Sequence, residues 1–464
     1  MSSSIHPVQT YIQRERDRFR DELFHFLRIE SISTDPTKKD EILRASGFLV
    51  EKMNQAGLQN VQQMETGGHP VVYGEWIQDP SLPTVLVYGH YDVQPPDPLD
   101  EWKTPPFEPT IRENRVYARG ASDDKGQSYT HLKAIESWLQ TVGSLPVNVK
   151  CLFEGEEEIG SPHLVPFIRK HLEMLACDMV LISDTAMFDE NQPSITYGLK
   201  GLAYMEVEVR GPNRDLHSGV YGGGVENPAH ALAVIISKLK DEEGLIQIDG
   251  FYDDVEALTD EERASMARLP FDEDRYRSSL DVPKLHGEKG YTTLERTTAR
   301  PTLDVNGLWS GYQGEGAKTV LPARAGAKIS MRLVPNQHPD RIADLFRSYI
   351  ESIAPETVHV SVRTHHGGHP VRIDPTFYGI QAAAEAFGTI YGKDILFSRE
   401  GGSIPIVADF MNELNAPSVL MGFGLSKDAL HSPNESFSLD DFDRGIQTSA
   451  LFLEKLRAMT EERT

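Results

Sequence analysis

Residue types that bind metal ions follow several short apolar runs in this sequence. The runs and the polar residues after them are Thr84–Gly89 with His90 and Asp92, Val147–Phe153 with Glu154–Glu158, Met179–Ile182 with Asp184, and Ser418–Gly422 with His431. The carboxyl ends of strands in an open α/β sheet meet in one crevice, so these side chains can converge. Two histidines with several carboxylates suit a pair of divalent ions such as Zn²⁺ or Mn²⁺.

The acidic run Glu154–Glu158 is the sharpest of these patterns, because it comes directly after a strand-like apolar run. Adjacent carboxylates repel one another unless cations lie nearby. Neighbouring side chains also diverge in direction, so one Glu can bind metal while the next stays free as a general base for water. The alternative is a solvated acidic turn, which is the usual fate of a charge run.

The other candidates also have structural readings. His90 is either a metal ligand oriented by Asp92 or a strand-end histidine beside a solvated Asp. Within Arg119–Gly126, Asp123 can bridge two cations, or an Asp can simply cap the helix that follows. Asp184 and His431 are each weak evidence for a metal site. Together with His90, Asp123 and the Glu154–Glu158 run they complete a set of potential ligands.

Composition limits the classes of partner. The 464 residues carry 46 Lys and Arg against 70 Asp and Glu, a net charge of −24. Nucleic acids and anionic membranes both require a basic surface, so we expect neither as a partner. Hydrophobic content of 39% with 25% charged residues is ordinary for a soluble globular enzyme, and the length allows two or three domains.

The chain has two cysteines, Cys151 and Cys177, and both lie in or beside apolar runs. Two cysteines make no disulfide framework, which favours a reducing compartment. We see no signal peptide in the first residues and no stretch of 18 apolar residues. We therefore expect a cytoplasmic protein.

Strand and helix patterns alternate through the first part of the chain. Residues 8–30 and 40–57 have the spaced apolar positions of amphipathic helices, and Gln127–Gln140 is a helical stretch between two strand-like runs. This alternation predicts an α/β domain with a mixed, mostly parallel sheet.

The pattern changes near Tyr197. Residues 201–211 alternate apolar and polar, as do later strand-like stretches at 326–334 and 357–364 around a helix at 339–353. A helix is also expected from Pro228 through Lys240, and the charge-rich residues 252–300 have helical spacing. We predict a catalytic domain formed by residues 1–196 and 371–464, with an α+β domain, residues 197–370, inserted into it.

Two residues of the inserted domain are further candidates. His217 precedes a glycine-rich loop and is either a loop histidine or a donor that stabilises an oxyanion. Arg332 interrupts an apolar alternation, so it either lies on a solvent-exposed strand face or holds a substrate carboxylate.

The combined motifs resemble the M20 family of metallopeptidases, and within it the cytosolic non-specific dipeptidase and carnosinase branch. The resemblance runs from about residue 10 to the end, and it rests on the motifs Gly89–Val93, Arg119–Gly126, Glu154–Ser161 and Asp215–Gly219. It implies two divalent ions in each subunit, with Zn²⁺ as the first choice and Mn²⁺ or Co²⁺ as alternatives. It also implies a homodimer formed through the inserted lid domain.

The resemblance assigns roles residue by residue. Asp123 would bridge the two ions, His90 and Asp184 would bind one, and Glu158 and His431 would bind the other. Glu157 would be the general base, Asp92 would orient His90, and His217 would reach into the partner subunit's site. A cis peptide is implied between Asp123 and Asp124. The substrate's C-terminal carboxylate would be held by Arg332, Thr319 and Ser403. Asn306 stands where carnosinase-like members usually carry a His, which leaves its role open.

These observations predict a metal-dependent hydrolase that cleaves dipeptides or short peptides with a free C-terminal carboxylate. The closest alternative is an N-acyl amino acid deacylase with the same metal site. The extended segment 252–300 and the Arg332–Thr319 clamp favour peptides. A non-catalytic binding module on the same fold is disfavoured, because every expected ligand position and Glu157 are present.

Overall fold

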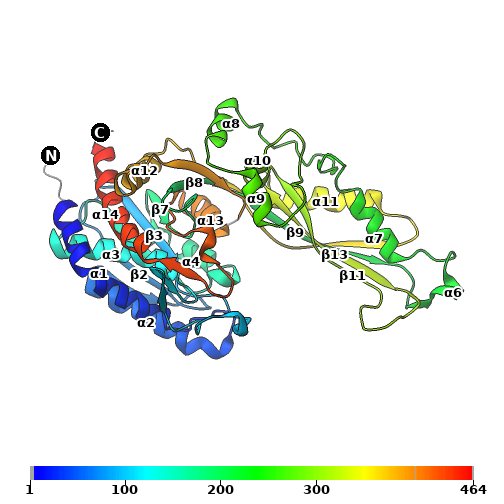
Figure 1. Ribbon diagram of the computed structural model, residues 1–464, viewed down its shortest axis with the longest axis horizontal. Coiled ribbons are helices and arrows are strands. Elements are labelled where there is room, and N and C mark those ends of the chain that lie inside the picture. Colours follow the sequence, from blue (N-terminus) through cyan, green and yellow to red (C-terminus); the bar gives the residue numbers. More distant parts are fainter. Residues whose placement is uncertain (1–4, 403, 462–464) are drawn as a thin grey trace. The chain divides into compact units, whose positions relative to one another are not determined.

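The computed structural model describes residues 5–402 and 404–461, and the chain forms two compact units (Figure 1). Unit 1 comprises Met1–Tyr197, Ile373–Ser398 and Asp409–Thr464, and unit 2 comprises Gly198–Arg372 and Arg399–Ala408. Unit 2 thus interrupts unit 1 in sequence. It also includes Arg399–Ala408, which the sequence-based boundaries leave with the first domain.

A mixed β-sheet forms the centre of unit 1, which confirms the predicted α/β class, but antiparallel pairings outnumber the parallel ones, so the sheet is not mostly parallel. β3 pairs in parallel with β6 and β7, and β7 pairs in parallel with β17. β1–β2, β2–β6 and β17–β8 are antiparallel, and β15 and β16 also pair with β8. The strands are β1 (Gln59–Met64), β2 (Val71–Trp76), β3 (Thr84–His90), β6 (Asn148–Glu154), β7 (Met179–Ile182), β8 (Ser194–Leu199), β15 (Val371–Arg372), β16 (Leu396–Glu400) and β17 (Ser418–Leu420), of which β15 and the last residues of β8 and β16 belong to unit 2.

The parallel strands carry the apolar runs seen in the sequence. Every residue of β6 and β7 is buried, and β3 is buried from Val85 to His90. Strands that are covered on both faces have such continuous runs. Because β3, β6 and β7 run in the same direction, their carboxyl ends deliver His90, Glu154 and Ile182 to one edge of the sheet.

The helices of unit 1 pack around α3 (Lys125–Thr141), which is buried at every position from Lys125 to Trp138. α1 (Ile5–Leu27), α2 (Lys39–Ala56) and α14 (Leu439–Glu461) all contact α3 (Figure 1). The buried Lys133 lies 2.6 Å from carboxylate oxygens of Glu22 and Glu136. Buried charges need such partners. The remaining helices are α4 (Leu164–Lys170), α5 (Leu172–Leu175), α12 (Tyr378–Tyr391) and α13 (Pro405–Leu414), of which α13 begins in unit 2.

A second, three-stranded sheet of unit 1 has the order β18-β5-β4. Its strands are β4 (Thr110–Arg112), β5 (Arg115–Tyr117) and β18 (Ser436–Ser438). β5 is the strand that precedes Arg119, and it does not belong to the central sheet. Asp123 is therefore carried by the loop between β5 and α3.

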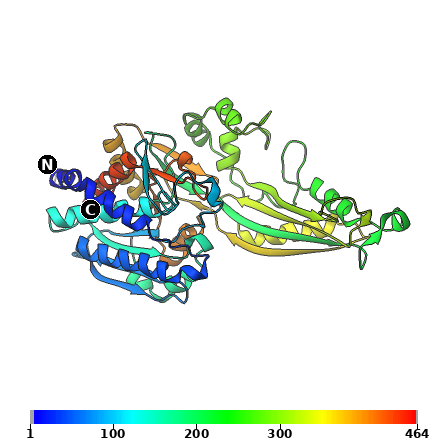
Figure 2. The same ribbon diagram turned by 60° about the horizontal axis from the view of Figure 1, so that its bottom comes forward.

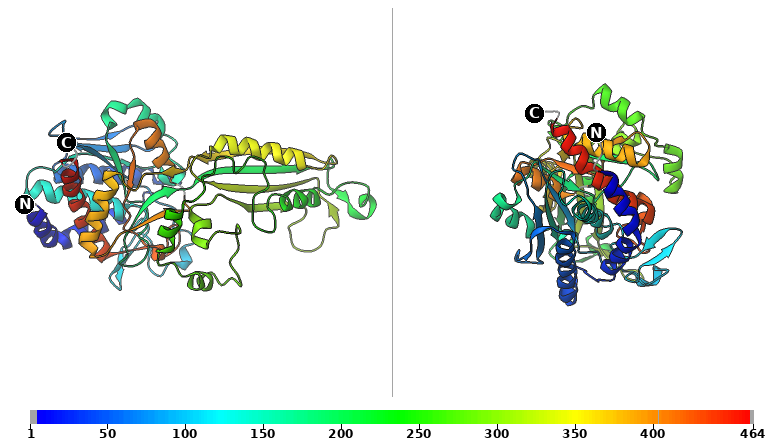
Figure 3. Two further views of the ribbon diagram at one scale, coloured as in Figure 1. Left: turned by 90° about the horizontal axis from the view of Figure 1, so that it is seen from above. Right: turned by 90° about the vertical axis from the view of Figure 1, so that its left-hand side faces the viewer.

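Unit 2 contains an antiparallel sheet in the order β11-β13-β9-β14, seen side by side in Figure 2. Helices α7 (Pro228–Ser237) and α11 (Pro339–Ile353) pack on its apolar face, and the left view of Figure 3 shows α11 running along the strands. Alternate residues of β9 are buried, as the sequence pattern predicts. The strands are β9 (Gly201–Arg210), β11 (Thr302–Ser310), β13 (Arg324–Leu333) and β14 (His359–Gly368).

Two helical predictions in unit 2 are modified by local capping. α7 ends at Ser237 rather than Lys240, and the Asp241 carboxylate then accepts the N–H groups of Glu243 and Leu245 in a tight turn. Residues 252–300, where the sequence shows helical spacing, form three short helices, and α8 and α10 begin with capping boxes. These helices are α8 (Asp260–Ala267), α9 (Glu273–Ser279) and α10 (Thr293–Thr298).

Candidate metal centre

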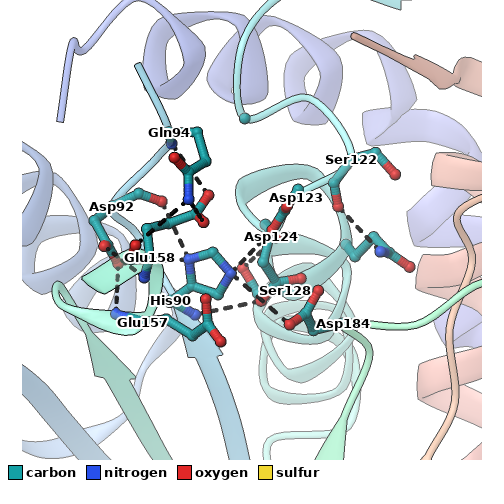
Figure 4. Close-up of polar contacts among 12 residues, drawn as sticks. His90, Asp92, Gln94, Ser122, Asp123, Asp124, Ser128, Glu157, Glu158 and Asp184 are labelled. Carbon is teal, nitrogen blue, oxygen red and sulfur yellow. Dashed lines mark hydrogen bonds and ion pairs between the residues drawn. The ribbon is translucent and has the colours of Figure 1, made fainter. Parts of the chain in front are cut away.

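His90 lies fully buried at the carboxyl end of β3. Its Nε2 atom is 3.1 Å from Asp123 Oδ1 and 4.0 Å from Asp184 Oδ2, and Nδ1 is 3.1 Å from the backbone oxygen of Asp92 (Figure 4). Gly89 allows this arrangement, because a Cβ there would lie 2.5 Å from the side chain of Ser128 and 2.8 Å from Asp124 Oδ2. Nε2 thus faces the two carboxylates while Nδ1 is held by the backbone.

His431 brings a second histidine to the other oxygen of Asp123. Its Nε2 atom is 2.8 Å from Asp123 Oδ2 and 3.3 Å from Glu158 Oε2. Potential ligand atoms therefore fall into two groups, one of His90, Asp123 and Asp184 and one of Asp123, Glu158 and His431. Asp123 belongs to both. The resemblance implies the same division, and the assignment of these residues as ligands stays a prediction.

The Asp92 carboxylate is fully buried and has a wider set of contacts than the sequence indicates. Oδ1 accepts the N–H of Glu157 at 3.2 Å and lies 3.5 Å from Nδ1 of His90. Oδ2 accepts the N–H of Glu158 at 3.1 Å (Figure 4). Asp92 thus links His90 to the 3₁₀ turn η3 (Glu157–Ile159), so one carboxylate orients the candidate ligands and the candidate base together.

Glu157 and Glu158 differ in their surroundings, as neighbouring side chains of a turn should. The Glu158 carboxylate accepts hydrogen bonds from the backbone N–H and the side-chain amide of Gln94, at 3.1 and 2.7 Å. Glu157 is partly buried. Its burial, and then the negative charges of Asp184 and Asp123, raise its pKa well above the usual value, although His90 opposes them. A base that acts near neutral pH needs a raised carboxyl pKa.

The histidines respond to the same excess of carboxylates. Hydrogen bonds that the ring donates to the Asp123 and Glu158 carboxylates raise the pKa of His431 to about 10. Burial lowers the pKa of His90, but Asp123 and Asp92 outweigh burial and hold it well above its usual value. The protein therefore gathers negative charge around two imidazoles, an arrangement that a divalent cation would stabilise.

Asp124 behaves differently from Asp123, although the two are adjacent and joined by a cis peptide bond, as the resemblance implies. It occupies the N-cap position of α3, but its side chain makes no capping hydrogen bond. One of its oxygens accepts the N–H of His90 at 3.3 Å. Burial, and then Asp184 and Asp123, raise its pKa well above the usual value. Asp124 thus supports His90 from the backbone side.

His217, Thr319 and Arg332 belong to unit 2. His217 Nδ1 accepts the N–H of Gly219 at 3.0 Å, so in the neutral ring the proton lies on Nε2. The exposed Thr319 lies beside it, because its backbone oxygen accepts the N–H of Ser218 at 3.2 Å.

Arg332 is half-buried on β13, and burial lowers the pKa of its guanidinium. Asn306 is exposed on β11, where the pairing with β13 shifts register between Val305 and Gly307. Ser403 lies outside the described residues.

Gln94 is a contact of the site that the sequence did not identify. It follows the motif Gly89–Val93 directly, so position in the chain was a usable signal, but its residue type was not. The amide donates to Oε2 of Glu158, the oxygen that also lies 3.3 Å from Nε2 of His431. In metal sites, ligating carboxylates are commonly oriented by such hydrogen bonds from neighbouring residues.

Two histidines and three carboxylates, with Asp123 common to both groups, could hold metal ions. Residues 86–455 match Peptidase family M20/M25/M40, and the chain belongs to this family. The enzyme class predicted from the sequence, an M20 metallopeptidase, is therefore confirmed.

The chain is similar to several known proteins over almost its whole length. It is 32% identical to the Cys-Gly metallodipeptidase dug1 of Schizosaccharomyces pombe, covering 99% of this chain and 100% of the relative. It is 31% identical to the human Beta-Ala-His dipeptidase, covering 97% and 92%. The crystal structure of the M20 family metallo-carboxypeptidase Sso-CP2 from Sulfolobus solfataricus has a TM-score of 0.84 at 36% identity, covering 95% of this chain and 99% of that chain.

Proposed function

We propose that the protein is a dinuclear metal-dependent peptidase that hydrolyses dipeptides, or short peptides with a free C-terminal carboxylate. The observation that carries the proposal is the pair of potential ligand groups that share Asp123. The names of the relatives, a Cys-Gly metallodipeptidase and a Beta-Ala-His dipeptidase, support dipeptides as the substrate class.

The residues present fit two divalent ions. One group would hold an ion through His90 and Asp184, the other through Glu158 and His431, with Asp123 common to both. Nitrogen and oxygen donors of this kind suit Zn²⁺ first, with Mn²⁺ or Co²⁺ as alternatives. When bound, such ions lower the pKa of a coordinated water and polarise a carbonyl oxygen.

Glu157 would carry the proton in the reaction. Its carboxylate would accept a proton from the attacking water, and the raised pKa favours keeping that proton near neutral pH. Glu157 would then deliver the proton to the nitrogen of the leaving amine. Asp92 would hold Glu157 in place, because its Oδ1 atom accepts the backbone N–H of Glu157 at 3.2 Å.

His217 would donate a hydrogen bond to the oxyanion that forms at the scissile carbonyl. The tautomer supports this role, because Nδ1 accepts from Gly219 and leaves the proton on Nε2. We propose, as the resemblance implies, that this donor acts in the partner subunit's site. The substrate carboxylate would be held by Arg332, Thr319 and Ser403.

Unit 2 has a surface that suits the proposed homodimer. β11 is an edge strand, and it exposes Leu308 by 59%. Beside it, a groove of about 520 Å³ is lined mainly by apolar residues of α7 and β11. An exposed apolar edge strand readily pairs with another chain. Leu308→Arg should therefore convert a dimer to a monomer in light scattering, and an unchanged mass would contradict this interface.

We also propose a cellular compartment and domain boundaries for the protein. Among residues 5–402 and 404–461, no helix combines the length and apolar character needed to cross a bilayer. Cys151 and Cys177 are both free, which supports the proposed reducing, cytoplasmic location. The domain boundaries at 196–197 and 370–371 also belong to the proposal.

The decisive assay is hydrolysis by metal-stripped protein with Zn²⁺, Mn²⁺ or Co²⁺ added back. A panel of dipeptides, C-terminally amidated dipeptides and N-acetyl amino acids separates the substrate classes. We expect metal-dependent cleavage of dipeptides with a free carboxylate. Cleavage of N-acetyl amino acids alone would move the protein to the deacylase class, and activity without any metal would reject the proposal.

Mixed dimers test the role of His217 in the partner subunit. Glu157→Gln and His217→Ala should each be inactive as homodimers. If His217 acts across the dimer, a heterodimer of the two has one complete site, and random mixing should restore about a quarter of wild-type activity. No recovery, with heterodimers verified by mass spectrometry, would place His217 in its own subunit's site.

A further inference from the structure

The segment that carries His431 has an unusual backbone. Ala429, His431 and Asn434 all have positive φ angles, 60°, 58° and 65°. Residues other than glycine rarely adopt this conformation, and they keep it only where surrounding contacts impose it. The His431 side chain is itself 58% exposed, so its immediate packing does not fix it. The contacts that hold the segment must therefore lie at its ends.

A buried carboxylate anchors the end of the segment nearest β18. Glu435 is 0% exposed, and all its hydrogen bonds go to the loop that leads to Asp123. Oε1 accepts the backbone N–H groups of Ser122 at 2.9 Å and Asp123 at 3.0 Å. Oε2 accepts the N–H of Gly120 at 2.9 Å and an Arg119 guanidinium nitrogen at 2.8 Å. One side chain thus fixes three consecutive or near-consecutive backbone donors.

The pairing of two short strands places Glu435 there. β18 pairs antiparallel with β5, and the N–H of Ala118 donates to the backbone oxygen of Glu435 at 3.1 Å. These two chain segments are more than 300 residues apart in sequence, and each carries one residue of the proposed ligand group. Asp123 lies on one segment and His431 on the other, and Nε2 of His431 is 2.8 Å from Oδ2 of Asp123.

The other end of the segment is held in the same way. Asp428 is fully buried, and its Oδ2 accepts the Ser122 hydroxyl at 3.1 Å and the N–H of Leu425 at 2.8 Å. Arg115 donates to its other oxygen. Ser122 therefore donates through its backbone to Glu435 and through its side chain to Asp428. The loop beside Asp123 and both ends of the His431 segment form one connected unit.

We infer that Glu435 is a positioning residue of the metal centre, which holds the backbone of Asp123 and the segment of His431 in the geometry for binding metal. This inference rests on the proposed metal-binding function. A buried ion pair with Arg119 alone would not require the two hydrogen bonds at Oε1. Those bonds fix the backbone of Asp123, the residue shared by both ligand groups, so a change at Glu435 should weaken the binding of both ions.

Glu435→Gln tests the inference with almost no change of shape. A Gln amide has one acceptor oxygen and one NH₂ donor. In one orientation the NH₂ group faces the N–H groups of Ser122 and Asp123, and in the other it faces Gly120 and Arg119. Either way, two of the four acceptor contacts become contacts between donors.

The matched control is Glu136→Gln. Glu136 is 4% exposed, and it accepts from Lys133 at 2.6 Å on α3. It is therefore an equally buried, ion-paired carboxylate of unit 1, and it makes none of the contacts described for the metal centre. Loss of its charge reports the general effect of removing a buried ion pair on stability.

The experiment titrates metal-free protein with Zn²⁺ in a calorimeter and with Co²⁺ in a spectrophotometer. Glu435→Gln should lower metal affinity roughly 10- to 100-fold and change the visible Co²⁺ absorption at saturation. Glu136→Gln should leave affinity within about twofold, since distant substitutions act independently. Glu435→Gln with wild-type affinity and an unchanged Co²⁺ spectrum would overturn the inference.

A second variant covers a failure of Glu435→Gln to fold. Glu435→Asp keeps the charge that faces Arg119 and withdraws the carboxylate by one methylene from the backbone donors. With native circular dichroism, an affinity loss of at least about tenfold supports the inference, and full affinity overturns it. Wild-type protein that binds no metal would instead reject the proposed function.

Discussion

Asp92→Asn is the substitution whose effect follows most directly from the contacts of the site. Both Asp92 oxygens are engaged: Oδ1 with the N–H of Glu157 at 3.2 Å and Oδ2 with that of Glu158 at 3.1 Å. Oδ1 also lies 3.5 Å from His90 Nδ1. Asn keeps the shape but replaces one acceptor by a donor, so at least one of these contacts is lost.

The expected loss of activity in Asp92→Asn follows from the loss of one hydrogen bond. A hydrogen bond to a buried charged group contributes about 1.5–3 kcal/mol. At about 1.4 kcal/mol for each factor of ten, the loss corresponds to a roughly 10- to 100-fold lower kcat/KM. Because η3 carries both the candidate base and a candidate ligand, we expect kcat to fall and metal affinity to weaken together.

The assay measures kcat and KM for a dipeptide at saturating metal, and metal affinity by titration. Asp441→Asn is the control, because Asp441 is 5% exposed and accepts the Tyr391 hydroxyl at 3.1 Å on α14. The control should stay within about twofold of wild type. If correctly folded Asp92→Asn also stays within twofold, the proposed link between His90 and the Glu157 turn is wrong.

Three other predictions use different readouts. Glu157→Gln should lower kcat about 10²- to 10⁴-fold while metal content, measured by mass spectrometry, stays at the wild-type level. Arg332→Met should raise KM for a dipeptide roughly 10- to 100-fold but leave KM for its C-terminal amide unchanged, because only the free acid offers a carboxylate. The third concerns stability: burial raises and the ammonium of Lys133 lowers the pKa of Glu22, which is held at about 2. This ion pair should contribute about 3 kcal/mol to the free energy of unfolding above pH 4.5, and the contribution should disappear as the pH falls towards 2. The free energy of unfolding of Glu22→Gln, measured in urea, should therefore depend less steeply on pH over this range than that of the wild type.

The sequence predicted the central sheet well because local pattern and burial agree there. The apolar runs at β3, β6 and β7 are buried on both faces, and their parallel pairing fixes where His90, Glu154 and Asp184 emerge. The position of Asp123 could not be derived in this way. Its loop is fixed by pairing with a segment more than 300 residues later, and spacing along the chain carries no information on such a contact.

The contacts that orient the candidate ligands were also beyond the sequence. Asp92 was expected to orient His90, but its two hydrogen bonds to the turn at Glu157 depend on the relative placement of two loops. Gln94 and Glu435 have residue types common on any surface. In unit 2, alternation predicted β9 and β13, whereas the division of residues 252–300 into short helices depends on capping at Thr259 and Thr292.

Anomalous diffraction from crystals grown with Zn²⁺ would show whether two ions bind on either side of Asp123. We expect two peaks for each chain, about 3.5–4 Å apart, with Asp123 between them. One peak should lie beside His90 and Asp184, and the other beside Glu158 and His431. A single peak, or two peaks that do not share Asp123, would contradict the dinuclear centre.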